Sequence, residues 1–167
     1  MRFGRIFYFV IILICVIETA RLWSLSPAQM AAHFNIEGNP DRFVSKAEFF
    51  WFEIKTMLIV LGVSVLPQLL FLVLPASLIN LPNREYWLTE ERREETLNRL
   101  SAFGASLFGI IILTVQAAFE LATYANLRTP IRFDSQQMLI MMIGSLVGIV
   151  GLLAWMLFSF RLPDQME

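Results

Sequence analysis

The sequence of 167 residues is 57% hydrophobic and 16% charged, whereas soluble domains carry about 25% charged residues. This composition excludes an ordinary soluble globular domain. The net charge of −1 argues against nucleic acid as a partner, and the single cysteine, Cys15, excludes a disulfide framework within the chain.

Long apolar runs dominate the sequence, and almost all charged residues lie between them. Each run is close to the length of about 20 residues that an α-helix needs to cross a bilayer. The sequence therefore predicts an all-α membrane protein with four transmembrane helices in a single domain, residues 1–167. The expected spans are 6–23, 54–79, 102–125 and 137–160, with a structured outer loop at 24–53 and an opposite loop at 80–101.

The first run follows a basic start that contains Arg2 and Arg5. A signal-peptide cleavage site near Ala20 is disfavoured, because Glu18 stands where such a site needs a small residue. We interpret the run as an uncleaved signal-anchor. The positive-inside rule then favours a cytoplasmic position for both termini and for the 80–101 loop.

The loop after the first span contains several local structure signals. Pro27 predicts a short helix that runs through Ala32, and a turn is expected at residues 38–41, which read GNPD. Ser45 precedes Glu48 by three residues, which is the spacing of a capping box. We therefore expect a helix to begin near Lys46 as an interfacial segment that leads into the second span.

Polar side chains interrupt two of the predicted spans. Glu18 lies in the first span, and Gln116 and Glu120 lie one turn apart in the third. Because an ionisable group inside a bilayer is costly, such residues usually face protein or water. Glu18 could pair with Arg21, and Glu120 either has a partner, such as an arginine or lysine of the outer loops, or has a functional role.

Glycines in the fourth span indicate a face for close helix contact. Gly144, Gly148 and Gly151 include a small-xxx-small pair at 144 and 148. The contact could lie within the chain or be made with another subunit.

No catalytic arrangement is recognisable in the sequence. It has no Ser/His/Asp pattern and no glycine-rich phosphate loop, and a metal set built on the only histidine, His33, has no supporting spacing. We therefore expect a protein that is not an enzyme, with no catalytic residue, no metal and no cofactor.

Residues 33–46 read HFNIEGNPDRFVSK. This stretch resembles the HFN-x-x-G-x-PD-x-x-x-SK signature of a bacterial membrane-domain family of unknown function, which also forms the N-terminal part of SdpI-type toxin-immunity proteins. Residues 80–87 resemble a segment after the second span of some members. The resemblance implies a multi-pass protein of the bacterial plasma (inner) membrane with the motif outside the cytoplasm. The predicted recognition motif consists of His33, Phe34, Asn35, Gly38, Pro40, Asp41, Ser45 and Lys46.

Two functions remain open on this evidence, and a third, a membrane-embedded metal hydrolase that uses His33, ranks last. The first is a small integral membrane protein that acts through protein contacts, as an accessory subunit or an immunity or sensor-type factor. Its partners would be the lipid bilayer and another membrane protein or its own copies. The alternative is an oligomeric transporter or ion-handling protein that uses Glu18, Gln116 and Glu120.

Overall fold

The computed structural model describes residues 2–73, 75 and 78–162, with the backbone alone at residues 2–5, 67, 68 and 70–72. Its elements are α1 (Arg2–Leu25), β1 (Gln29–Phe34), β2 (Pro40–Ser45), α2 (Lys46–Val73), α3 (Arg84–Trp87), a 3₁₀ turn (Glu90–Arg92), α4 (Arg93–Asn126) and α5 (Ser135–Ser159). Four of the described helices, α1, α2, α4 and α5, are long and apolar enough to cross a membrane. The predicted fold class is therefore confirmed.

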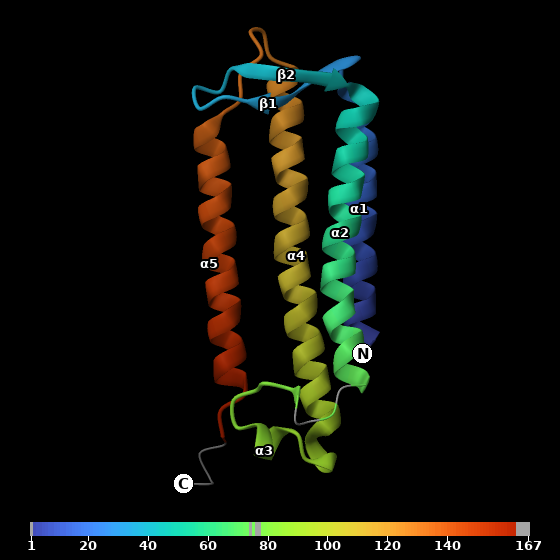
Figure 1. Cartoon of the computed structure of the whole chain (residues 1–167), viewed down its shortest axis with the longest axis vertical. Helices are drawn as coiled ribbons and strands as arrows, with labels where there is room; N and C mark the ends of the chain where they lie inside the picture. Colours follow the sequence, from blue (N-terminus) through green and yellow to red (C-terminus); the bar gives the residue numbers. More distant parts are fainter. Residues whose placement is uncertain (1, 74, 76–77, 163–167) are drawn as a thin grey trace.

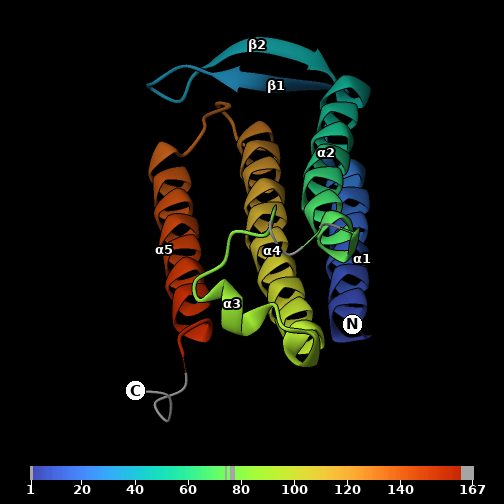
Figure 2. The ribbon, with the colours of Figure 1, turned by 60° about the horizontal axis from the view of Figure 1, so that its bottom comes forward.

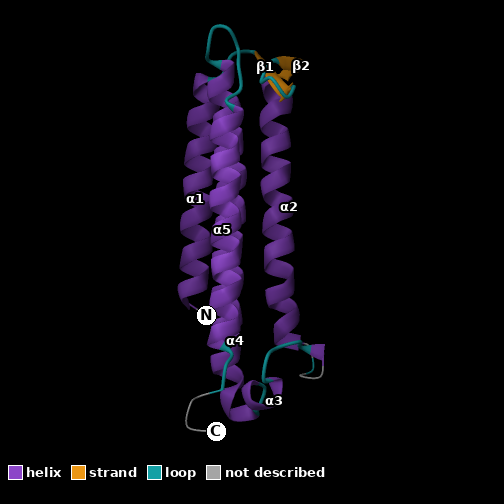
Figure 3. Ribbon diagram, turned by 90° about the vertical axis from the view of Figure 1, so that its left-hand side faces the viewer, coloured by secondary structure: helices purple, strands orange, loops and turns teal. Residues whose placement is uncertain are grey.

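Helix α4 is the element on which the other long helices pack. It contacts α1, α2 and α5, whereas α1 and α2 touch each other much less. Figure 1 shows α5, α4 and α2 side by side, and the side view in Figure 3 places α1 and α2 on opposite sides of the α4–α5 pair. Helix α1 begins and α5 ends at the same end of the bundle as α3 (Figure 1), which we call the α3 end.

A two-stranded antiparallel hairpin, β1 with β2, crosses the opposite end of the bundle (Figure 2), which we call the hairpin end. Ala31 pairs with Phe43, and the register is irregular on both sides of His33. The short helix predicted from Pro27 to Ala32 was wrong, because most of this segment is strand β1. The backbone N–H and C=O groups of Ala31 both bond to the side chain of Asn126 at the end of α4, so they have a tertiary partner in place of a helical one.

Helix α2 begins at Lys46, as the capping-box spacing predicts. The Ser45 side chain receives the Glu48 backbone N–H at 3.2 Å, while Glu48 Oε2 accepts the Ser45 N–H at 2.9 Å. The segment between the first two long helices is therefore shorter than the predicted loop of 24–53, and Glu53 lies two turns inside α2.

Three small apolar cores lie along the bundle, and the middle one joins α1 to α4. It contains Ile11, Cys15, Phe108 and Ile112. Next to it, a Cβ at Gly109 would lie 2.9 Å from the Phe7 ring and 3.1 Å from Ile11. Gly109 therefore allows an approach of α1 to α4 that a side chain would block.

At the α3 end, side chains from residues 83–99 cover the last carbonyl groups of α5. Trp87 Nε1 and Asn83 Nδ2 both donate to the Phe160 carbonyl oxygen, at 3.0 and 2.9 Å, and Arg99 donates to that of Ser159. These bonds provide partners that a helix end cannot supply for itself. The stretch that includes Asn83 and Trp87 thus fixes the end of α5.

Candidate functional site

The hairpin tip is attached to the loop between α4 and α5. Gly38 has φ +82°, and a Cβ at this position would collide with the Phe133 carbonyl oxygen. The Phe133 N–H donates to the Gly38 carbonyl oxygen at 2.8 Å, and the rings of Phe34 and Phe133 lie 5.1 Å apart between centroids. Glycine is therefore required here for both its backbone angle and its small size.

Side chains of the predicted recognition motif also hold the hairpin turn and the start of α2. Asn35 Oδ1 accepts the backbone N–H groups of Glu37 and Asn39, and Pro40 opens β2 opposite Phe34. Lys46 Nζ donates to the Ser26 carbonyl oxygen at 3.0 Å and lies 4.7 Å from the Trp23 ring centroid. These motif residues therefore stabilise the hairpin turn and the start of α2.

His33 and Asp41 form a pair on the exposed side of the hairpin. His33 Nδ1 donates to Asp41 Oδ1 at 2.6 Å, and the side chains are 67% and 44% exposed. Because the pair joins β1 to β2 at the irregular part of the register, it too supports the hairpin.

The hairpin also presents side chains that its own structure leaves exposed. Ile36 at the turn is 91% exposed, and Phe43 on β2 is 50% exposed. Glu37 and Arg42 are exposed beside them. Besides the exposed His33–Asp41 pair, the side chains available for contact thus include those at the intervening positions of the motif.

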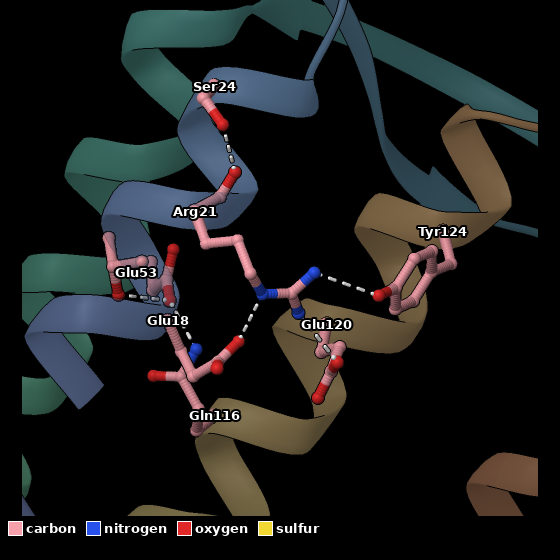
Figure 4. Close-up of polar contacts among 8 residues, drawn as sticks. Glu18, Arg21, Ser24, Glu53, Gln116, Glu120 and Tyr124 are labelled. Atoms are coloured by element: carbon pink, nitrogen blue, oxygen red, sulfur yellow. Dashed lines mark hydrogen bonds and ion pairs between the residues drawn. The ribbon is translucent and has the colours of Figure 1, made fainter. Parts of the chain in front are cut away.

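A charged network joins α1 to α4 below the hairpin, and Figure 4 shows its geometry. The Arg21 guanidinium donates to Glu18 at 2.7 Å, to Glu120 at 3.0 Å and to the Tyr124 hydroxyl at 3.0 Å. The pairing of Glu18 with Arg21 is as predicted. Glu120 has a partner as well, but this partner lies on α1 and not in an outer loop.

A second polar cluster, Thr19, Glu53 and Gln116, lies at the contact of α1, α2 and α4. Glu53 is completely buried. Its Oε1 accepts from the Thr19 hydroxyl at 2.9 Å and from Gln116 Nε2 at 3.2 Å, whereas Glu53 Oε2 and Gln116 Oε1 have no partner among the described residues. Because Gln116 and Glu120 are one turn apart on α4, the two clusters are neighbours (Figure 4).

The sequence interpretation missed Thr19, Tyr124 and Glu53, and it missed Glu53 because the predicted span began only at residue 54. Residues 49–54 read FFWFEI, so a lone carboxylate stands between aromatic and aliphatic side chains. Together with the helix start at Lys46, this run indicates a carboxylate inside the span. In contrast to Glu53, the side chains of Glu18 and Glu120 are 34% and 37% exposed.

The three glycines of α5 do not share one environment. A Cβ at Gly148 would lie 3.5 Å from Ile110 of α4, but a Cβ at Gly144 or Gly151 would meet nothing within 4 Å. Only Gly148 of the three thus faces another helix. Among the glycines that the structure describes, Gly109 allows a close helix approach, and sequence spacing did not single it out.

An apolar groove of about 660 Å³ runs between α1 and α2, with Phe108 and Ile112 of α4 also in its lining. Thr19 is a polar residue on its wall. Among the described residues, no three His, Cys, Asp or Glu side chains gather in a way that could hold a metal ion.

Residues 10–54 match the model of a family described as a domain of unknown function (DUF1648). The matched stretch contains most of α1, the whole hairpin and the first turns of α2. It therefore includes Thr19, Arg21 and Glu53, while their partners on α4 lie outside it. Comparisons with curated proteins and with solved structures found no match. The chain is thus similar, over its N-terminal third, to a family without an assigned activity.

Proposed function

We propose that this chain is a small, non-enzymatic protein of the bacterial plasma membrane that acts through protein contacts made by its hairpin. It would serve as an accessory subunit or as an immunity or sensor-type factor, and its partner would be another membrane protein. The resemblance of residues 33–46 to the signature found in SdpI-type immunity proteins supports this class of function.

The observation that carries the proposal is a fixed hairpin with exposed apolar side chains. Bonds to Asn126 and Phe133 attach both its base and its tip to the rest of the chain. A segment already ordered in this way loses little conformational entropy on binding. Ile36 and Phe43 are thus presented on a preorganised support.

A photo-crosslinking amino acid at position 36 or 43 tests this proposal in intact cells. We expect a discrete protein adduct from both positions, and none from position 146, a lipid-facing control on α5 where Leu146 is 61% exposed. Lipid adducts alone at all three positions would contradict the proposal.

The proposed orientation places the hairpin outside the cytoplasm. Asn39→Cys on the hairpin and Glu94→Cys near the α3 end, both exposed, are made in a Cys15→Ala background. An impermeant thiol reagent applied to whole cells should label position 39 and should label position 94 only after permeabilisation. The reverse pattern would invert the orientation.

A second candidate function, ion handling by an oligomer, is favoured by the buried Glu53–Gln116 pair. Of the three residues that the sequence suggests for ion handling, Glu18 and Glu120 are bonded to Arg21. The remaining residue, Gln116, would therefore carry this activity together with Glu53. Ion flux in proteoliposomes that is lost in Glu53→Gln would support it, and the absence of flux from wild-type protein would argue against it.

A further inference from the structure

In the Thr19–Glu53–Gln116 cluster, two buried oxygens each lack a hydrogen-bond donor among the residues that the structure describes. Glu53 is completely buried and Gln116 is 5% exposed. Gln116 donates its amide to Glu53 Oε1, yet Gln116 Oε1 and Glu53 Oε2 receive no hydrogen bond from the described residues. Two unsatisfied acceptors on a pair of groups already in contact indicate that a donor is missing between them.

The charged groups around the cluster do not neutralise a Glu53 carboxylate by direct contact. On α1, Arg21 donates its hydrogen bonds to Glu18, Glu120 and Tyr124, and Cys15 lies one turn before Thr19. On α4, Glu120 follows Gln116 by one turn, and on α2 the nearby Lys55 is exposed. No ion pair of Glu53 occurs within the described part of the chain. A buried carboxylate with no cation is strongly disfavoured in a membrane.

We propose that Glu53, with Thr19 and Gln116, forms a proton-binding site at the junction of α1, α2 and α4. One proton on Oε2 removes the charge and converts this oxygen into a donor. The acid can then donate to Gln116 Oε1 while Gln116 Nε2 donates to Glu53 Oε1, so that acid and amide exchange two hydrogen bonds. The Thr19 hydroxyl, at 2.9 Å, completes the partners of Oε1.

The site couples proton binding to helix packing, because its three residues come from three helices. Loss of the proton leaves an ionised group at a contact that excludes water, and α2 must then move away from α4 or admit a cation or water. The inference concerns this cluster alone and holds whether or not the hairpin binds a partner.

Infrared spectroscopy of the full-length protein in liposomes tests the proposal at neutral pH. We expect the carbonyl band of a protonated carboxylic acid in wild type, its loss in Glu53→Gln and its retention in Glu120→Gln, the matched control whose carboxylate is paired with Arg21. If Glu53→Gln does not fold, Gln116→Leu serves instead: without the amide acceptor, the band should shift to higher frequency.

The absence of a Glu53 carboxylic-acid band at neutral pH would overturn the proposal. A band that is present in choline chloride but disappears in sodium chloride would also overturn it, because a sodium ion would then be the resident ligand. As an independent readout, the Tm of wild type should fall as pH rises above neutral while that of Glu53→Gln stays constant. The folded state would then hold a proton that the unfolded state releases, and an unchanged difference between the two Tm values would contradict this.

Discussion

The two sides of α4 differ in how they are held. On one side, α1 and α2 contact α4 through the Arg21 network, the Glu53 cluster and the close approach at Gly109. On the other side, α5 contributes no buried residue, and its hydroxyl contact with α4 is the 2.6 Å pair of Thr114 and Ser145. Because lipid is as apolar as the helix faces, polar bonds and small residues decide helix association in a bilayer. Along its length α5 is therefore held less firmly than α1 and α2, and its fixed point is the α3 end, where Arg99 of α4 donates to the Ser159 carbonyl oxygen.

The largest effect is expected from Arg21→Leu, which leaves Glu18 and Glu120 without their shared cation. We expect the free energy of unfolding to fall by more than in any variant below, because Glu18 and Glu120 both lose the cation that they share. Unfolding in mixed micelles measures the change. Arg128→Leu, an exposed arginine at the same end, is the control and should change stability by less than about 0.5 kcal/mol. Equal losses of stability in the two variants would show that the Arg21 network does not hold α1 to α4.

Gly109→Leu tests the close approach of α1 to α4. Insertion of a side chain against Phe7 and Ile11 should cost about 2 kcal/mol through overpacking. Gly151→Leu is the matched change on α5, where open space surrounds the glycine, and it should cost less than about 0.5 kcal/mol. Comparable losses from both would mean that the two sides of α4 pack equally closely.

Asn126→Leu tests the attachment of the hairpin base. The N–H and C=O groups of Ala31 lose their side-chain partner, and we expect a loss of about 1.5 kcal/mol with faster hydrogen exchange at residues 29–34. Asn39→Ala at the exposed turn keeps these bonds and should leave the exchange of β1 unchanged. Unaltered exchange in Asn126→Leu would show that the hairpin is ordered without α4.

The smallest effect is expected from Ser145→Ala, which removes one interhelical hydroxyl bond. Such bonds in membranes contribute about 0.6 kcal/mol on average, so a loss of that size is expected in the same unfolding assay. A loss above about 2 kcal/mol would show that α5 is held as firmly as α1.

The spans could be predicted from the sequence because a bilayer demands long apolar helices, and the start of α2 because the Ser45–Glu48 capping box is local. The hairpin could not, since the partner of Ala31 is Asn126, which is 95 residues away. For the same reason the partner of Glu120 was sought in the outer loops, whereas Arg21 reaches it only because α1 packs on α4.

Tertiary contacts also give several residues of the predicted recognition motif a structural role in place of the predicted one. Asn35, Gly38 and Lys46 are bonded within the hairpin and its support, so in the proposed function exposed neighbours such as Ile36 would make the contacts. Glu53 was missed because the predicted span began at residue 54, whereas the helix apolar enough to cross a membrane begins at Lys46. A sequence pattern places the ends of an apolar span least accurately, and a carboxylate beside the run can then be assigned to the wrong segment.

The most direct test of the difference between the two sides of α4 is a pair of double-mutant cycles in lipid. One cycle combines Arg21→Gln with Glu120→Gln, and the other combines Thr114→Val with Ser145→Ala. We predict a larger coupling energy for the charged pair than for the hydroxyl pair, which should be about 0.6 kcal/mol. Equal coupling energies, or a larger value for the hydroxyl pair, would contradict the difference between the firm contacts of α1 with α4 and the weaker contacts along the length of α5.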